Sequence, residues 1–556
     1  MSSSANTTSS SAATQVVDSS KPAAGSMAQY VDADDLRTMF SQAMSAMYRA
    51  EVPLYGDLIR IVNETNTAVL ATSADAKIEA LRRHGNVAAE RLDLERHGAI
   101  RLGKPDELHT VRRLFRIIGL DPVGYYDLSV AGLPMHATAF RPTDPAALKK
   151  NPFRVFTTLL RPELLVDADA RDLALSLLAR RNIFTRQLMQ LIAAAESPAQ
   201  GGRLTTEQAP LFIAEAMKTF SWRAAAVATE AEYLQLKAEH PILADIACFQ
   251  SSHINHLTPR TLDIEVAQDR MLDDGLAIKD RIEGPPRRNC PILLRQTSFL
   301  ALEEKIKFPQ SLGGSSVPAA VDEETLLDDS QHPEDDDAAD PASYKIGTHK
   351  ARFGEIEERG AAVTPLGRKL YDRLLHESSL AAASAGHPAS SQRQHNRRMD
   401  EASERIFGAS YPDSWDALRK QGLVYFTYTP TTTTTTTPAV QATGTPSGGE
   451  TVTIESLLTQ GLIEATPLTY EDFLPFSAAG IFQSNLATGT EHQHSPPAAT
   501  SPSKQPGQVK LSISDVKALE RAMGCKVLDA DKLYAAAQAE SLRKCEVALG
   551  LPEGSL

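Results

Sequence analysis

Two histidines lie close together in the segment SSHINHLTPRTLDIE, residues 251–265. His253 and His256 are three residues apart, so an extended chain places their side chains on opposite faces, whereas a helical turn places them on one face. Pro259 argues against a helix that continues through this segment. We therefore predict an extended segment in which only one of the two histidines faces a given site. A metal bound there would take its other ligands from elsewhere in the chain.

A third histidine precedes an arginine in RLDLERHGAIRLG, residues 91–103, which alternates toward a strand. On a strand the side chains of His97 and Arg101 face the same way, with their Cα atoms ~13 Å apart. The planar guanidinium of Arg101 is suited to a carboxylate, so an acid of a few carbons would fit between it and a metal on His97. The simpler interpretation is that His97 is a surface or capping group and Arg101 a salt-bridge partner.

Candidate carboxylates occur in ARFGEIEERG, residues 351–360, where Glu355 and Glu357 alternate on one strand face with Phe353. Only one of the two glutamates needs to be a ligand, and a glutamate beside arginines is normally a solvated charge. His253 also has two interpretations, since it either orients His256 from behind or binds a loop carbonyl. Periodicity alone does not choose between these alternatives.

Two histidines and one carboxylate form the facial ligand set of non-haem Fe(II) sites, which leaves positions for a bidentate 2-oxo acid and dioxygen. The same ligands are compatible with zinc, whose bound water would serve hydrolysis. The common nucleotide-binding and hydrolase signatures, such as GxGxxG after a strand, the Walker loop, HExxH and GxSxG, do not occur in the sequence. The sequence thus favours metal chemistry and leaves the metal open.

The composition bounds the class of protein. With 556 residues the chain is too long for one ordinary core, so two domains or one large domain with appendages are expected. A hydrophobic content of 42% and a charged content of 23% are typical of a soluble globular protein, and no run approaches the ~18 apolar residues of a membrane span. The net charge of −13 argues against a general nucleic-acid role, which needs a basic face.

The cysteines and the N-terminal residues bear on the cellular compartment. Cys248, Cys290, Cys525 and Cys545 are scattered and form no CxxC pair, which fits a reducing compartment and argues against a disulfide frame or a zinc knuckle. Residues 1–20 lack both the apolar core of a secretion signal and the arginines of an import sequence. A cytoplasmic protein is expected.

Helical and strand-like patterns come in blocks rather than in strict alternation, which predicts an α+β fold. Helices are expected from Asp34 with an interruption at Pro53, over 104–119, 168–196 and 206–222, and near the C-terminus over 514–523 and 530–549. Strands are expected within 91–103, as a hairpin over 124–142, over 242–249, 261–266 and 290–299, and at the start of a strand-then-helix segment over 351–375.

Low-complexity composition marks the segments that we expect to lie outside the core. Residues 1–27 are rich in Ser, Thr and Ala and are predicted to be a disordered tail. Residues 28–556 are predicted to form a single large catalytic domain. Three disordered insertions are expected in it, at about 309–345, 430–450 and 487–507.

Eight blocks occur in order along the sequence: RHGAIRLG, VGYYDLS, HATAFRP, NPFRVFTTLLRPELL, HINHLTPRTLDIE, EGPPRRNCPILLRQTSF, ARFGEIEERG and YEDFLPFSAAGIFQSN. Together they closely resemble the 2-oxoadipate dioxygenase/decarboxylase family, also called 2-hydroxyglutarate synthases and long known as a domain of unknown function. The resemblance runs from about Val31 to the C-terminus apart from the three insertions, and eight long blocks in the same order are highly specific.

The resemblance implies a fold and a set of site residues. The fold would be a curved β-sheet similar to that of the vicinal oxygen chelate enzymes, cupping the metal and surrounded by added helices. His97, His256 and Glu355 would bind Fe(II), and Arg101 would hold the distal carboxylate of the substrate. Phe476 and Ser477 would close over the substrate, although Phe476 replaces a small aliphatic residue such as valine and implies a narrower pocket.

The implied reaction converts 2-oxoadipate and dioxygen to 2-hydroxyglutarate and carbon dioxide in lysine catabolism. The oxo acid is both the reductant and the target, so no separate 2-oxoglutarate is needed. The expected partners are a small 2-oxo acid and O2, without nucleic acid or membrane, and the pathway makes mitochondrial residence an alternative to the cytoplasm. Two other functions are compatible with the same residues, namely turnover of a different 2-oxo acid and non-catalytic oxoacid binding.

Overall fold

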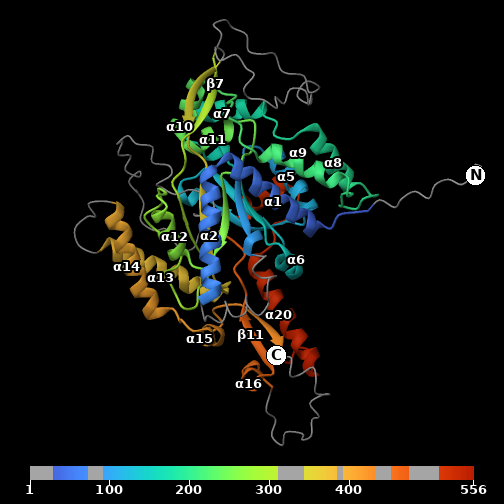
Figure 1. The fold of residues 1–556 in the computed structure, drawn as a ribbon, viewed down its shortest axis with the longest axis vertical. Helices are drawn as coiled ribbons and strands as arrows, with labels where there is room; N and C mark the ends of the chain where they lie inside the picture. Colours follow the sequence, from blue (N-terminus) through green and yellow to red (C-terminus); the bar gives the residue numbers. More distant parts are fainter. Residues whose placement is uncertain (1–28, 73–91, 311–343, 385–391, 432–451, 475–512) are drawn as a thin grey trace, which may run out of the picture.

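The computed structural model describes residues 29–72, 92–310, 344–384, 392–431, 452–474 and 513–556 (Figure 1). The predicted N-terminal tail and most of each predicted insertion lie outside these residues, as do Phe476 and Ser477. Within the described residues, no helix has the length and the apolar character that are needed to cross a membrane.

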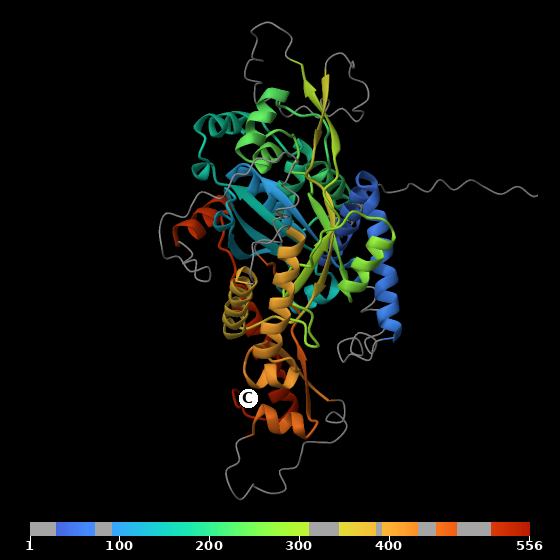
Figure 2. The same ribbon diagram turned by 90° about the vertical axis from the view of Figure 1, so that its left-hand side faces the viewer.

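A curled sheet of seven strands forms the centre of the molecule (Figures 1 and 2). In spatial order its strands are β2 (Asp121–Asp127), β3 (Met135–Arg141), β4 (Arg154–Leu160), β1 (Arg96–Leu102), β5 (His256–Thr261), β9 (Phe353–Arg359) and β6 (Leu294–Ser298). The α+β class and the curved sheet with added helices are therefore confirmed.

The sheet is built from two units of similar connectivity. In the first, β1 leads through α5 (Pro105–Ile117) to β2, β3 and β4, and β4 returns to pair in parallel with β1. In the second, β5 leads through α12 (Ile264–Asp273) to β6, and β9 returns to pair in parallel with β5. The hairpin of β7 (Glu304–Pro309) and β8 (Tyr344–His349) separates β6 from β9. The units join where β1 pairs antiparallel with β5.

Strand β1 is buried on both faces, because each face packs against a different hydrophobic core. Ile100 and Leu102 belong to the core beneath α1 (Ala33–Glu51), α2 (Pro53–Thr72) and α5. Ala99 belongs to a second core on the opposite face of the sheet. Because side chains alternate along a strand, residues 97, 99 and 101 share this second face.

Helices surround the sheet, and a further small sheet lies toward the C-terminal part of the chain. In Figure 1 α2 crosses in front of the sheet, and α13, α14, α15 and α20 lie below it. The remaining elements are α6 (Pro145–Lys150), α7 (Ala168–Ala179), α8 (Arg186–Glu196), α9 (Gln208–Phe220), α10 (Glu230–Glu239), α11 (Pro241–Ala247), α13 (Pro365–Ala383), α14 (Gln392–Ser410), α15 (Trp415–Lys420), β10 (Phe426–Pro430), α16 (Ile454–Thr459), β11 (Ile463–Pro467), α19 (Ile513–Met523), α20 (Ala530–Leu549) and the short 3-10 helices Ser129–Ala131 and Pro162–Leu164.

Most predicted elements are confirmed, including the break between α1 and α2 at Pro53, the β2–β3 hairpin, β9 followed by α13, and α19 and α20. The helix predicted over 168–196 is two helices, because the chain leaves helical geometry after Ala179 and Thr185 caps α8 anew.

Two predicted strands are wrong. Residues 242–249 begin as the helix α11, with Pro241 in its first turn and the His240 side chain accepting a hydrogen bond at its N-terminus. Residues 261–266 mostly belong to α12, which Asp263 caps, and the strand of this region is the preceding β5. Short apolar runs do not distinguish a buried helix from a strand.

Gly354 tests the close packing of α2 against β9. A Cβ atom at Gly354 would lie 2.2 Å from a ring carbon of Phe299 and 2.8 Å from a methyl carbon of Leu58. We expect Gly354→Ala to lower the free energy of unfolding by about 1–3 kcal/mol, the usual cost of overpacking. Gly408→Ala is the matched control, because nothing lies within 4 Å of that Cβ and the site is helical. It should be neutral or stabilising in the same urea denaturation experiment, and equal effects would contradict the packing argument.

Candidate metal centre

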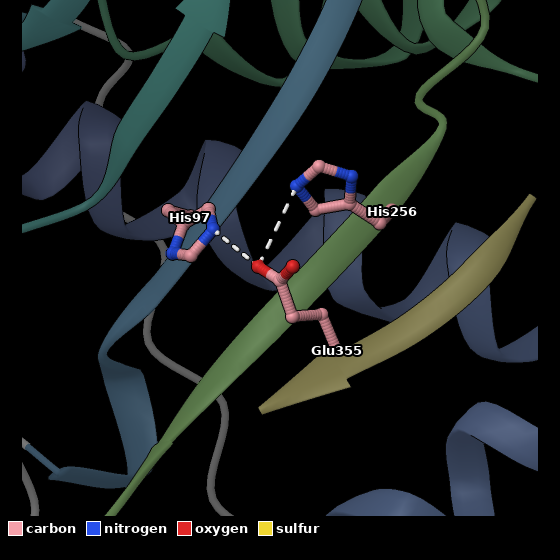
Figure 3. A group of neighbouring side chains, drawn as sticks. All are labelled: His97, His256 and Glu355. Atoms are coloured by element: carbon pink, nitrogen blue, oxygen red, sulfur yellow. Dashed lines mark hydrogen bonds and ion pairs between the residues drawn. The ribbon is translucent and has the colours of Figure 1, made fainter. Parts of the chain in front are cut away.

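Three fully buried side chains from three adjacent strands meet on the second face of the sheet. His97 comes from β1, His256 from the start of β5 and Glu355 from β9. One potential ligand atom from each lies within 4.8 Å of the other two. Figure 3 shows both imidazoles around the Glu355 carboxylate. Residues that are 258 positions apart in the chain are brought into contact because β1, β5 and β9 are neighbours in the sheet.

The polar contacts of Glu355 gather on one of its two oxygens. Oε1 accepts hydrogen bonds from Gln296 Nε2 at 2.7 Å and from Thr258 Oγ1 at 3.1 Å, and it lies 3.1 Å from His97 Nε2 and 3.9 Å from His256 Nε2. Oε2 and both ring nitrogens of His256 are buried without a hydrogen-bond partner among the described residues. Buried polar atoms of this kind are costly unless they are satisfied. The donor set therefore fits a bound cation.

Glu357 fixes His97 from behind. Its Oε2 lies 3.2 Å from His97 Nδ1, and its two oxygens accept hydrogen bonds from Arg154 Nη2 at 2.5 and 2.7 Å. Arg359 Nε donates a further bond of 2.7 Å. A carboxylate on the far nitrogen of a histidine orients the ring and makes the other nitrogen a better ligand. The two glutamates thus face different partners: Glu355 faces the histidines, and Glu357 faces two arginines and the back of one histidine.

The charge states suit metal binding. Burial, followed by the charges of His97, Arg101 and Lys279, holds the pKa of His256 well below its ordinary value, so this imidazole is neutral. Burial by itself would raise the pKa of Glu357, but Arg154 and Arg359 outweigh it and hold that pKa well below its ordinary value. A neutral imidazole is the form that binds a metal, and an ionised Glu357 can orient the ring of His97.

Arg101 lies four residues beyond His97 on β1, and its charge reaches His256 strongly enough to lower the pKa of that histidine. Arg101 Nη1 donates a 2.6 Å hydrogen bond to Asp245 Oδ2. The other histidine of the pair, His253, also contacts Asp245, with its Nε2 3.1 Å from Asp245 Oδ1. The two histidines therefore belong to separate groups of buried side chains, one with Glu355 and the other with Asp245.

Sequence reasoning missed several residues of this region, namely Thr258, Gln296, Arg154, Asp245 and His349. Asp245 offers a signal in retrospect, because an acid inside the apolar run ILADIACF is rarely buried without a partner. His349 carried none, since it follows a predicted insertion. Gln296 and Thr258 contact Glu355 only through the pairing of β6 and β5 with β9, which spacing along the chain does not reveal.

The facial arrangement of two histidines and one carboxylate leaves coordination positions open and is used by non-haem Fe(II) enzymes. Zinc accepts the same donors. Three protein donors are one fewer than a closed structural site uses, and the choice of metal depends on the chemistry of the family.

Comparison with known proteins identifies this family. Residues 40–485 match the family model described as 2-oxoadipate dioxygenase/decarboxylase. The chain is 42% identical over 522 residues to the 2-oxoadipate dioxygenase/decarboxylase of Pseudomonas putida, covering 94% of this chain and 98% of the relative. It is also 42% identical over 520 residues to the enzyme of the same name from Escherichia coli, covering 93% and 99%.

A solved structure agrees in fold over nearly the same length. The crystal structure of the hydroxyglutarate synthase from Pseudomonas putida in complex with 2-oxoadipate superimposes with a TM-score of 0.75 at 40% identity, covering 94% of this chain and 100% of the other.

The buried charges around Glu357 predict a large effect on stability. Glu357→Gln leaves Arg154 and Arg359 without their shared carboxylate, so we expect a loss of about 3–5 kcal/mol in the free energy of unfolding near neutral pH. Glu64→Gln removes an exposed partner of Arg60 and Arg270 and should cost less than about 1 kcal/mol.

The sign of the pH dependence follows from the lowered pKa. Glu357 stabilises the fold fully above the ordinary glutamate pKa, and this contribution is lost as the pH falls toward its native pKa. The difference between wild type and Glu357→Gln should therefore shrink in acid, as measured by urea denaturation over a pH series. A constant difference would contradict the assigned charge state.

Proposed function

Because the chain belongs to the 2-oxoadipate dioxygenase/decarboxylase family, we propose that it converts 2-oxoadipate and dioxygen to 2-hydroxyglutarate and carbon dioxide. The observation that carries this proposal is the buried group of His97, His256 and Glu355, whose donor atoms gather within 4.8 Å. The reaction balances without another reductant. The six-carbon oxo acid loses one carbon as carbon dioxide, and the two atoms of dioxygen enter the new carboxylate and the new hydroxyl group.

We assign Fe(II) as the metal and His97, His256 and Glu355 as its protein ligands. The chemistry that Fe(II) supplies in such a site is chelation of a 2-oxo acid and activation of dioxygen. The orphaned Oε2 of Glu355 and the neutral, unpartnered imidazole of His256 support this assignment. Gln296 and Thr258 hold Glu355 Oε1, and Glu357 holds the His97 ring, so the ligands are oriented before substrate binds.

Arg101 is the residue that we expect to bind the distal carboxylate of the substrate. It lies on the same strand and face as His97, four residues further along β1. A guanidinium binds a carboxylate through two parallel hydrogen bonds, which fixes direction as well as distance. Anchoring the far end of the diacid would determine which carbon lies nearest the metal and is hydroxylated. His97 belongs to the substrate site as well, because the metal that it binds would hold one end of the substrate while Arg101 binds the other.

Aromatic side chains close one side of the candidate centre. The Phe473 ring packs edge-on against His97 with centroids 5.0 Å apart, and Phe156 packs against Phe473 at 5.3 Å. This apolar wall limits the access of water to the ligands, which strengthens the electrostatic interactions within the site.

We place the reaction in lysine catabolism, the origin of 2-oxoadipate that the family resemblance implies.

Oxygen consumption by the Fe(II)-loaded full chain tests the function. Uptake should be fastest with 2-oxoadipate in a panel that includes 2-oxoglutarate, 2-oxopimelate and 2-oxohexanoate, with one carbon dioxide and one 2-hydroxyglutarate formed per dioxygen. Faster turnover of another oxo acid would replace the substrate and keep the enzyme class. Uptake of iron and 2-oxoadipate without oxygen consumption would favour a binding protein instead.

Removal of one ligand tests the metal centre separately from turnover. His256→Ala should weaken iron retention by more than ~10-fold, because loss of even an outer hydrogen-bond partner typically costs 10–100-fold. Iron would be quantified after anaerobic dialysis, with circular dichroism as the check on folding. His109→Ala is the control, since His109 lies on α5 and contacts the Met523 carbonyl oxygen instead. Full iron retention by folded His256→Ala would contradict the ligand assignment.

A further inference from the structure

A second buried group lies beyond Arg101. Asp245 from α11, His253 from the segment before β5, and His349 from the end of β8 place one ligand-type atom each within 4.8 Å of the others. All three side chains are almost fully buried. The group therefore joins three elements that are remote in sequence, and it does so next to the arginine that we assign to substrate binding.

Asp245 is the centre of this group and uses both of its carboxylate oxygens. Oδ2 accepts the 2.6 Å hydrogen bond from Arg101 Nη1 and lies 3.5 Å from Asn255 Nδ2. Oδ1 lies 2.9 Å from His349 Nε2 and 3.1 Å from His253 Nε2. Burial would raise the pKa of Asp245, but Arg101 and the two histidines outweigh it and hold this pKa well below its ordinary value. The carboxylate is therefore ionised.

His349 is fixed on its other side by a tyrosine. Tyr233 Oη lies 2.9 Å from His349 Nδ1, so the hydroxyl can donate to this nitrogen while Nε2–H donates to Asp245. The indole of Trp222 stacks on the His349 ring with centroids 5.8 Å apart and meets the His253 ring edge-on at 4.7 Å. Asp245 is thus held from behind by two imidazoles that have little freedom to turn.

The same segment also fixes the backbone of β1. Ser252 Oγ donates a 3.0 Å hydrogen bond to the carbonyl oxygen of Arg101, and the backbone N–H of Asn255 donates to the carbonyl oxygen of Ala99. His256 follows directly as the first residue of β5. The chain that carries His253 therefore connects the backbone of Arg101, the side chain of Asp245 and one proposed metal ligand.

These contacts argue against a second metal. Arg101 Nη1 lies 2.6 Å from the carboxylate that such a metal would need, so a bound metal ion would lie near a permanent cation and be repelled by it in a buried site. In addition, an ionised Asp245 can only accept hydrogen bonds, so its 2.9 Å contact with His349 Nε2 places the proton on that nitrogen, and a protonated nitrogen cannot bind a metal.

We propose that Asp245 is a positioning residue that holds the Arg101 guanidinium in place for the distal carboxylate of a dicarboxylic 2-oxo acid, and so determines the preference for diacids over monoacids. This inference rests on the function proposed above. An arginine carries five N–H donors in a planar fork, more than one carboxylate takes, so it can bind Asp245 along one edge and a substrate along another. Fixing a long side chain in advance lowers the ordering cost when the substrate binds.

The test compares two ligands that differ only at the far end. Binding of 2-oxoadipate and of 2-oxohexanoate, which lacks the distal carboxylate, is measured by anaerobic calorimetry on the Fe(II)-loaded full chain. Asp245→Asn should weaken 2-oxoadipate binding by about 10-fold or more, the scale of losing one partner of a buried charge pair, while 2-oxohexanoate changes by less than about 2-fold. Iron content should stay at the wild-type level. Equal weakening of both ligands would overturn the proposal.

A double-mutant cycle asks whether Asp245 acts through Arg101. Arg101→Ala alone should also weaken 2-oxoadipate selectively, and Asp245→Asn should then cost nothing more in the Arg101→Ala background. Additive losses would overturn the proposal. Glu107→Gln is the matched control, because Glu107 forms another buried carboxylate–arginine pair, with Arg181. It should leave the ratio of the two affinities unchanged, and a selective loss of the diacid in this control would overturn the proposal too.

Two further measurements keep the outcome decisive. Where Asp245→Asn fails to fold, Tyr233→Phe removes the far end of the chain of contacts and should weaken 2-oxoadipate selectively by a smaller factor, about 2–5-fold. No selective change in that variant would overturn the proposal. A second metal equivalent per chain that disappears in His349→Gln would overturn it as well, since the group would then be a metal site. Wild-type protein that turns over no 2-oxoadipate would refute the proposed function, whereas normal turnover with an unaltered diacid preference in Asp245→Asn refutes this inference alone.

Discussion

Two carboxylates are buried on the same face of one strand, and the centre of the molecule is arranged to balance their charges. Glu355 and Glu357 are two residues apart on β9 and both are inaccessible to solvent. An ionised carboxylate in an interior must be paired, hydrogen-bonded or bound to a metal. Arg154 and Arg359 satisfy Glu357. Among the described residues no lysine or arginine forms an ion pair with Glu355, which instead meets imidazoles and neutral donors. Glu357 is thus paired with two arginines, whereas Glu355 lies beside two imidazoles, which is the arrangement from which we propose a metal site.

The pairing of strands brings two histidines to the glutamate that has no arginine partner in the described part of the chain, and so forms the candidate metal centre. The first strand of each unit, β1 and β5, lies at the junction of the sheet, so His97 and His256 approach each other across it. β9 returns parallel to β5 and brings Glu355 to the same place. Small residues beside the ligands allow this approach, since Gly98 and Gly354 face side chains that leave no room for a Cβ atom. Tight packing on the face of the sheet beneath α1, α2 and α5 therefore determines how closely His97, His256 and Glu355 approach one another on the opposite face.

Further along β1, Arg101 and Asp245 form a second buried ion pair in which opposite charges neutralise each other. Arg101 alone would be a long and mobile cation, but Asp245 is itself held by two buried histidines, one of which contacts the hydroxyl of Tyr233. Rigid support of this kind distinguishes an arginine that recognises one ligand geometry from one that merely attracts anions. The strand thus carries one proposed metal ligand, His97, and the proposed anchor for the distal carboxylate of the substrate, Arg101.

By itself the sequence determined the elements whose patterns are long or strongly alternating, such as α1, α2, α13, α20 and the strands β1 and β9. It also placed His97 and Arg101 on one face, and the resemblance to a family named Glu355 and His256 where periodicity left Glu357 and His253 as alternatives. The two predicted strands at 242–249 and 261–266 were wrong because short apolar runs carry no clear period.

Only the tertiary structure decided which residues share a neighbourhood. Asp245, His349, Gln296 and Arg154 join the site through strand pairing and helix docking, and no spacing in the chain encodes these contacts. The sequence supplies the types of side chain and the strand faces on which they lie. Burial and the pairing of strands determine which charged side chains come close enough to neutralise one another.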